Sequence, residues 1–192
     1  MTWRNDQVSQ PETEKIIEVA RECLVRPGDF VELGCYKGDT ALLVAEILPS
    51  DRRLYIYDSF EGLPEKSAKD VSVLGEDFRG GELAVTKREV KERFLRAGLK
   101  VPMIKKAWFN ELTPEDMPEK IAFAFLDGDF YESIKDSLKL VEPRMVDGGV
   151  IIVHDYNNPA LPGVKKAVDE WDCGKDVEKL EHLSMVILRN KR

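Results

Sequence analysis

The segment from Val31 to Ala45 constrains the fold of this chain more than any other segment. An apolar strand containing the acid Glu32 leads into a turn with Gly34 and Gly38, and an apolar helix begins directly afterwards. In α/β proteins this succession places the free amides of a helix start where the charged groups of a nucleotide bind. The segment therefore predicts a nucleotide pocket at the carboxyl end of a buried strand.

The spacing of the two glycines narrows the choice of nucleotide. They occur in the pattern Glu-x-Gly-x-x-x-Gly. Dinucleotide dehydrogenases use Gly-x-Gly-x-x-Gly, and loops that cradle phosphates use Gly-x-x-x-x-Gly-Lys-Ser/Thr. The pattern points away from both NAD and ATP.

Composition excludes several classes of partner. The chain has 192 residues and a formal net charge of -7, and we expect one domain over residues 1–192. No long basic run is present to follow a phosphate backbone, so nucleic acid is not an expected partner. The apolar runs are far shorter than the ~20 residues that span a bilayer, and the polar start has no signal core, which predicts no membrane association and a cytoplasmic location.

Three widely spaced cysteines, with no Cys-x-x-Cys pair, predict reduced thiols rather than a disulfide framework or zinc site: Cys23, Cys35 and Cys173.

Strand and helix patterns alternate along the chain, which favours a parallel sheet. The patterns predict strands at 30–33, 54–58, 102–105, 121–126 and 150–153, helices at 11–24, 40–48, 86–97, 131–141 and 163–171, and a turn at Gly148-Gly149.

Three further segments complete the outline. Residues 177–180 and 183–188 predict a terminal hairpin. The connection 59–81 is long and poor in periodicity, which is typical of a mobile lid or binding loop. The charged run 87–93 alternates in sign at i,i+4 spacing, as the solvent face of a helix does, and we assign it no function.

Asp58 ends the second predicted strand, about twenty residues beyond the glycine turn. An acid at this place can accept hydrogen bonds from both hydroxyls of a ribose, although a helix or turn cap is the alternative. Together, the glycine turn and the ribose acid indicate an adenosine-type cofactor.

Four motifs in order carry a family resemblance. They are Glu32-Leu33-Gly34-x-Tyr36-x-Gly38-x-Thr40-Ala41, Asp58-Ser59-Phe60-Glu61-Gly62-Leu63-Pro64, Leu126-Asp127-Gly128-Asp129-x-Tyr131-x-Ser133 and His154-Asp155-Tyr156. The first resembles class I S-adenosylmethionine-dependent methyltransferases, particularly the catechol O-methyltransferase branch. Together they resemble the macrocin O-methyltransferase family, whose known members methylate sugar hydroxyls of natural products. The resemblance implies an α/β fold: a Rossmann-like, doubly wound seven-stranded sheet, mostly parallel with an antiparallel last strand. The terminal hairpin agrees with it.

The resemblance also implies S-adenosylmethionine as cofactor. Glu32 and Asp127 are placed to meet the ammonium of its methionine tail. The amides from Gly34 to Gly38 and the Thr40 hydroxyl suit its carboxylate, because a helix N-terminus offers unpaired donors and partial positive charge. The other residues that we assign to the cofactor site are Tyr36, Asp58, Ser59 and Trp108.

Trp108 has two interpretations. It follows the predicted third strand, where this family places residues beside the adenine, and an indole can stack there. The alternative is ordinary core packing.

Asp127 and Asp155 each end a predicted strand. Adjacent parallel strands would bring both carboxylates together at the sheet edge, where they could hold Mg²⁺ beside the acceptor hydroxyl. By resemblance both are metal ligands, and Asp127 is therefore a catalytic candidate. The third ligand stays open between His154 and Asn157, because Tyr156 occupies the place of the asparagine in catechol enzymes. In the alternative interpretation, the two aspartates only cap the helices that follow.

The chain lacks the lysine that catechol enzymes place three residues beyond the first metal aspartate, since Phe130 stands there. A sugar hydroxyl needs a general base, and Asp129 and His154 are the candidates. His154, at the carboxyl end of a central predicted strand, is the better candidate of the two, and its alternative role is that of a hydrogen-bonded core histidine. We therefore expect a Mg²⁺-assisted O-methyltransferase for a small hydroxylated acceptor such as a sugar unit. The alternatives are a catechol-type enzyme and a non-catalytic cofactor-binding module. The sequence leaves the oligomeric state open, a homo-oligomer included.

Overall fold

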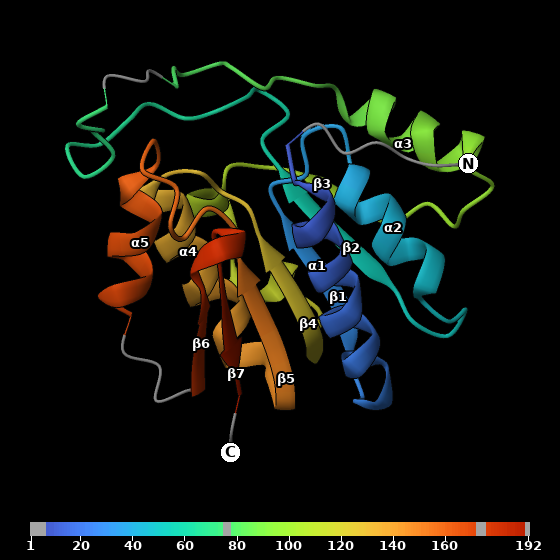
Figure 1. Cartoon of the computed structure of the whole chain (residues 1–192). Helices are drawn as coiled ribbons and strands as arrows, with labels where there is room; N and C mark the ends of the chain where they lie inside the picture. Colours follow the sequence, from blue (N-terminus) through green and yellow to red (C-terminus); the bar gives the residue numbers. More distant parts are fainter. Residues whose placement is uncertain (1–6, 75–77, 172–175, 191–192) are drawn as a thin grey trace.

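The computed structural model describes residues 7–74, 78–171 and 176–190, and it builds them around one seven-stranded sheet (Figure 1). The strand order is β3-β2-β1-β4-β5-β7-β6. Only β7 runs against the others, since it is antiparallel to both β5 and β6. The strands are β1 Asp29–Leu33, β2 Leu54–Asp58, β3 Met103–Lys106, β4 Ile121–Leu126, β5 Met145–Val153, β6 Asp176–Leu180 and β7 Met185–Arg189.

Helices cover both faces of the sheet, so the molecule has three layers (Figure 1). The first three helices share one hydrophobic core with the sheet, and the last two share the other. From Phe123 to Leu126 the side chains of β4 alternate between these cores, and all six residues of the strand are buried. The helices are α1 Gln10–Glu22, α2 Asp39–Ile47, α3 Lys87–Arg96, α4 Tyr131–Val141 and α5 Pro162–Asp169. Short 3-10 turns are η1 Cys23–Val25, η2 Phe109–Glu111, η3 Pro114–Asp116, η4 Glu142–Arg144 and η5 Glu181–Leu183.

The predicted doubly wound sheet with an antiparallel last strand is confirmed. One local prediction is wrong: Gly148-Gly149 is not a turn between elements but lies inside β5. Met145 pairs with Ile121 and Val150 with Phe123, so β5 uses extra residues against β4. Gly148, with φ of 69°, accommodates this irregularity.

The long connection from β2 to α3 crosses the end of the sheet toward α5 and returns (Figure 1). Its described residues contain no helix or strand. The two sides of the connection meet where Leu63 donates to the Glu82 carbonyl oxygen at 2.8 Å and Gly81 donates to the Leu63 carbonyl oxygen at 2.9 Å. These bonds hold its near end beside the strands. Within the described part of the chain, no helix has the length and apolar character to cross a membrane.

The strands from β1 to β3 are added toward one edge of the sheet, and β4 and β5 are added on the other side of β1. The order of the parallel strands therefore reverses between β1 and β4, and α/β proteins bind ligands at such a point. Gly34 follows β1 with φ of +85°, and a Cβ atom there would lie 2.0 Å from the Asp127 carbonyl oxygen. Only glycine fits this approach, because both the backbone conformation and the available space exclude a side chain. The glycine turn and the end of β4 are therefore in direct contact.

Replacing Gly34 with alanine should destabilise the protein far more than the same change at Gly81. Gly81 has the same φ of +85° but open space around its Cβ position, so Gly81→Ala carries only the left-handed strain of about 1–2 kcal/mol. Gly34→Ala adds the clash with Asp127. Urea unfolding of both variants measures the difference, and equal losses of unfolding free energy would contradict the close approach.

Candidate active site

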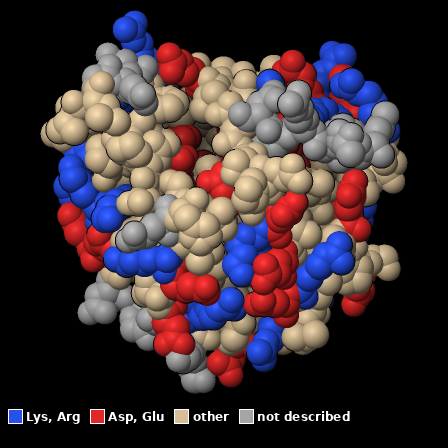
Figure 2. Space-filling model, viewed as in Figure 1, with Lys and Arg blue, Asp and Glu red and all other residues tan. Residues whose placement is uncertain are grey.

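A single pocket lies at the carboxyl ends of β1, β2, β4 and β5. In Figure 2, acidic side chains are visible within a hollow on the upper part of the molecule, while Lys and Arg elsewhere on this face are interspersed with Asp and Glu. The pocket contains most of the residues that the sequence assigns to the cofactor and to chemistry. Its lining includes Gln7, Glu32, Gly34, Cys35, Tyr36, Asp39, Thr40, Asp58, Ser59, Leu63, Trp108, Phe109, Asp127, Asp129, Ser133, His154 and Asp155.

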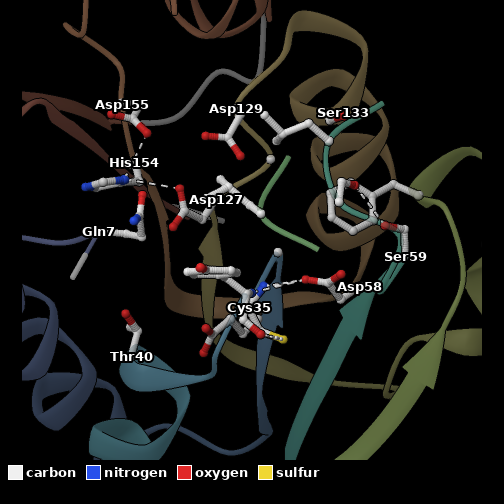
Figure 3. A pocket seen from close by; sticks show the side chains of 18 of the residues that line it. Gln7, Cys35, Thr40, Asp58, Ser59, Asp127, Asp129, Ser133, His154 and Asp155 are labelled. Atoms are coloured by element: carbon white, nitrogen blue, oxygen red, sulfur yellow. Dashed lines mark hydrogen bonds and ion pairs between the residues drawn. The ribbon is translucent and has the colours of Figure 1, made fainter. Parts of the chain in front are cut away.

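The glycine turn is held in shape by Asp58. The main-chain N–H groups of Cys35 and Tyr36 donate to its Oδ2 at 2.8 and 3.3 Å, and Phe60 N–H donates to its Oδ1 at 2.7 Å. Gly38 then caps α2 with a φ of 78°. Asp58 therefore caps the turn, which was the alternative to a ribose contact, and it also lines the pocket (Figure 3).

Glu32 is a buried carboxylate that faces the pocket with a free oxygen. It is 2% exposed, and its Oε2 has no hydrogen-bond partner among the described residues. Burial raises the pKa of Glu32 well above its usual value, and the nearby charges of Asp127, Asp58 and Asp39 raise it further. A cationic ligand group would satisfy both the orphaned oxygen and the excess negative charge.

His154 lies beside Asp127 and Asp155 in the pocket (Figure 3). Its Nδ1 is 3.1 Å from Asp127 Oδ1 and 3.1 Å from Asp155 Oδ2, and its Nε2 is 3.6 Å from Glu12 Oε1. Burial by itself lowers the pKa of His154, but the Asp127 charge and the contacts with these acids outweigh it and raise the pKa well above its usual value. The imidazolium form is therefore the favoured one.

Glu12 is a member of this cluster that the sequence motifs do not single out. It lies in α1, where its Oε2 accepts from Ser9 N–H at 2.8 Å and from Ser9 Oγ at 2.6 Å in a capping box. The Ser-x-x-Glu pattern predicts this local role. The contact of the other oxygen with His154 depends on how α1 packs, and no local pattern signals it.

Asp129 stands apart from the other acids. It has a φ of 59°, lines the pocket, and forms no hydrogen bond or ion pair with the residues that the structure describes. Burial raises the pKa of Asp129 well above its usual value, with further increases from the charges of Asp127 and Asp155. Because no described residue bonds to this side chain, the carboxyl group of Asp129 is available to a ligand.

Asp127, His154 and Asp155 each offer a ligand atom within 4.8 Å of the others. Two carboxylates and an imidazole are a donor set that fits a divalent cation. Asn157, the other candidate for the third ligand, is exposed and does not line the pocket, whereas Asn158 Nδ2 donates to Asp155 Oδ1 at 2.8 Å.

Ser59 and Trp108, which the sequence assigns to the cofactor site, both line the pocket. Ser59 Oγ donates to the Gly62 carbonyl oxygen at 3.0 Å and accepts from Glu61 N–H at 3.1 Å, so it shapes the turn after β2. Trp108 is partly exposed and belongs to neither hydrophobic core, which disfavours the core-packing alternative. Phe109, packed against one core, and Ser133 from α4 also line this pocket. Ser133 belongs to the third sequence motif but was assigned no role, and none of the four motifs contains Phe109.

Comparisons with known proteins agree on one family. The macrocin O-methyltransferase family model matches residues 11–186. The 8-demethyl-8-(2,3-dimethoxy-alpha-L-rhamnosyl)-tetracenomycin-C 4'-O-methyltransferase of Streptomyces olivaceus is 34% identical over 76% of this chain and 58% of its own length. The demethyldecarbamoylnovobiocin O-methyltransferase of Streptomyces niveus is 31% identical over 85% of this chain and 67% of its own length. The chain thus spans about three fifths to two thirds of these relatives.

The solved structure of the O-methyltransferase NovP has a similar fold. Its TM-score is 0.76 at 27% identity, and the match covers 94% of this chain and 79% of that chain.

The contact between Glu12 and His154 predicts a pH-dependent stability difference in protein kept free of metal with a chelator. Burial raises the pKa of Glu12, but its contact with His154 and its bonds to Ser9 lower it overall from 4.5 to about 2. A lowered pKa stabilises the fold above the unfolded value, and this stabilisation is lost as the pH falls toward 2. Glu12→Gln keeps the capping box, so its loss of unfolding free energy should reach at most about 3 kcal/mol near neutral pH.

Denaturant unfolding from about pH 6 to about pH 2 measures this difference, which should shrink with falling pH. Glu14→Gln is the matched control, because it removes an exposed carboxylate of the same helix. A difference for Glu12→Gln that stays constant over this range would contradict the coupling to His154.

Proposed function

The chain belongs to the macrocin O-methyltransferase family, and we propose that it transfers a methyl group from S-adenosylmethionine to a hydroxyl of a small glycosylated acceptor, at a sugar unit. The observation that carries this proposal is that one pocket joins Glu32, the glycine turn and Asp58 to the cluster of Asp127, Asp129, His154 and Asp155. A methyl donor and an acid–base centre can therefore be adjacent. The sugar O-methyltransferases among the relatives support the choice of acceptor.

Each part of the donor has a chemically suitable neighbour. We assign the ammonium of the methionine tail to Glu32 and Asp127, because Glu32 has an unpartnered buried oxygen. The tail carboxylate is assigned to the turn from Gly34 to Gly38 and to Thr40 at the start of α2. Tyr36 lines the tail side of this pocket.

The adenosine end uses three further residues of the pocket. Asp58 keeps unused acceptor capacity on its carboxylate for the ribose hydroxyls. Ser59 shapes the adjacent turn, and Trp108 offers an indole face to the adenine.

We assign the general base to Asp129 rather than His154. Both ring nitrogens of His154 face carboxylates, which favour its protonated form and leave it no lone pair to accept a proton. The Asp129 carboxylate lines the pocket without a partner among the described residues. Asp129 would take the acceptor proton as the new O–CH₃ bond forms, while the electron pair of the broken S–C bond stays on sulfur and leaves S-adenosylhomocysteine. Positioning and charge placement supply the rest of the acceleration.

We propose Mg²⁺ as a second cofactor, held by Asp127 and Asp155. When bound, it would lower the pKa of the acceptor hydroxyl. His154 remains the candidate third ligand, because it lies within reach of both aspartates whereas Asn157 lies outside the pocket. His154 would have to release a ring proton to solvent when the metal binds, and its lone pair would then be held by the metal.

The proposal covers residues 1–192 as one domain, since all seven strands join one sheet, and it places the activity in the cytoplasm with a small hydroxylated molecule as partner. Catechol-type transfer is the main alternative, and Phe130 in place of the catechol-enzyme lysine favours the sugar acceptor. A non-catalytic cofactor-binding module needs no general base, so the Asp129 side chain, which has no partner among the described residues, favours an enzyme.

Methyl transfer by the purified protein to a panel of rhamnosides, other glycosides and catechols tests the function, with Mg²⁺ and with a chelator. We expect methylation of a sugar hydroxyl that weakens when the metal is removed, because the acceptor hydroxyl then loses its Lewis acid. Transfer to catechols alone would favour the catechol-type enzyme. Binding of S-adenosylmethionine without any transfer would favour the non-catalytic module, and undiminished transfer in the chelator would remove the metal from the mechanism.

Asp129→Asn should lower kcat by about 10²–10⁴-fold, the usual contribution of a general base. Affinity for S-adenosylmethionine should change little, because the substitution keeps the size of the side chain and leaves the glycine turn intact. Calorimetry and steady-state kinetics on the same preparation separate these effects. Comparable activity of Asp129→Asn and wild type would contradict the assignment, and a loss confined to cofactor affinity would move Asp129 to the donor site.

A further inference from the structure

Arg93 reaches from α3 to the glycine turn. Its Nη1 donates to the Lys37 carbonyl oxygen at 2.7 Å, and its Nη2 forms an ion pair with Asp39 Oδ1. The side chain of Arg93 is 22% exposed and that of Asp39 is 8% exposed. The planar guanidinium thus holds two adjacent points of the turn at once, which an ammonium group does not reproduce.

The surroundings of Arg93 fix its position. Val90 and Phe94 of the same helix are fully buried, and a Cβ atom on Gly38 would lie 3.2 Å from Val90 Cγ1. The helix therefore packs directly on the turn, and α3 lies next to α2 in Figure 1. In the charged run 87–93, interpreted from the sequence as a solvent face, the side chain of Arg93 instead turns toward the glycine turn.

The charge of Arg93 has a consequence for the ligand. Asp39 is the first residue of α2 and lines the pocket beside Thr40. A helix N-terminus attracts a carboxylate, but an uncompensated Asp39 at the same place would repel it. The ion pair with Arg93 offsets this repulsion.

We propose that Arg93 is a positioning residue for the amino-acid end of the methyl donor. It holds the turn from Lys37 to Asp39 in the shape that presents its amides, and it neutralises Asp39 so that the carboxylate of the methionine tail can bind. This inference rests on the proposed function, because it requires the donor to lie with its tail at α2. It assigns Arg93 no contact with the donor itself.

Two nucleosides separate this role from a general effect on folding. S-Adenosylhomocysteine has the amino-acid tail, whereas 5′-methylthioadenosine has the same adenosine and sulfur without it. Arg93→Met removes the charge and both contacts but keeps an apolar stem. We expect it to weaken binding of S-adenosylhomocysteine by about tenfold or more, the upper range for a charge at a helix N-terminus, with binding of 5′-methylthioadenosine nearly unchanged. Calorimetry measures both.

Arg96→Met is the matched control, because Arg96 lies on the same helix with its side chain 72% exposed, and it should leave both affinities unchanged. Arg93→Lys should give an intermediate loss, since the ammonium group restores the charge but cannot contact both Lys37 and Asp39 as the planar guanidinium does. In Arg93→Met combined with Asp39→Asn, removal of the repelling charge should recover part of the affinity for S-adenosylhomocysteine. This pair also keeps the test valid if Arg93→Met alone does not fold.

Equal losses for the two nucleosides, or no loss for either, would overturn the positioning role. Absence of any recovery in the double variant would overturn its electrostatic part. A wild-type protein that binds neither nucleoside would instead contradict the proposed function, so the two failures are distinguishable.

Discussion

The close approach of Gly34 to the end of β4 is the constraint on which the rest of the site depends. Asp127 N–H donates to the Leu33 carbonyl oxygen at 2.9 Å, and Gly34 N–H donates to the Tyr57 carbonyl oxygen at 2.9 Å. The ends of β1, β2 and β4 are thereby locked together by main-chain hydrogen bonds. Because a side chain at position 34 would occupy the place of the Asp127 carbonyl oxygen, the glycine turn can lie directly against the residues that follow β4. The proposed donor site and the proposed acid–base centre are adjacent because of this one contact.

The same packing concentrates negative charge. Glu32 and Asp129 both have pKa values raised first by burial and then by neighbouring carboxylates, among them Asp127. Such a cluster opposes folding unless cations compensate it. His154 supplies one positive charge at the end of β5, and Arg93 supplies another at the glycine turn. A ligand that brought an ammonium, a sulfonium or a divalent cation would add further compensation, so its binding would stabilise the fold.

Sequence reasoning recovers the parts of this structure that local periodicity or strand order determines. The run 121–126 has no polar residue, as a strand buried on both faces requires, and it forms β4 at those bounds. Strand order alone places Asp127 and Asp155 together, because the carboxyl ends of adjacent parallel strands meet at one edge. The prediction of a turn at Gly148-Gly149 fails because a glycine pair within a bulged strand has the same local pattern as a turn.

Glu12 and Arg93 show why other parts could not be recovered. Each belongs to a local pattern that already explains it, a capping box in one case and a charged helix face in the other. Their second contacts, with His154 and with Asp39, join residues far apart in the sequence and depend on how a helix docks. A residue that satisfies a local pattern gives no sign of a tertiary partner.

The two helical layers contribute different kinds of residue to the pocket. Glu12 and Arg93 both come from the layer of α1, α2 and α3, and each contacts a residue of the pocket lining: Glu12 contacts His154 at the acid cluster, and Arg93 contacts Asp39 at the start of α2. The other layer contributes wall residues instead, since Ser133 lies in α4 and Asp129 comes just before it. The charge balance of the pocket therefore depends on how α1 and α3 pack on the sheet. The hydrophobic residues that pack α1 and α3 on the sheet thus also set the positions of Glu12 and Arg93, and through them the charges beside His154 and Asp39.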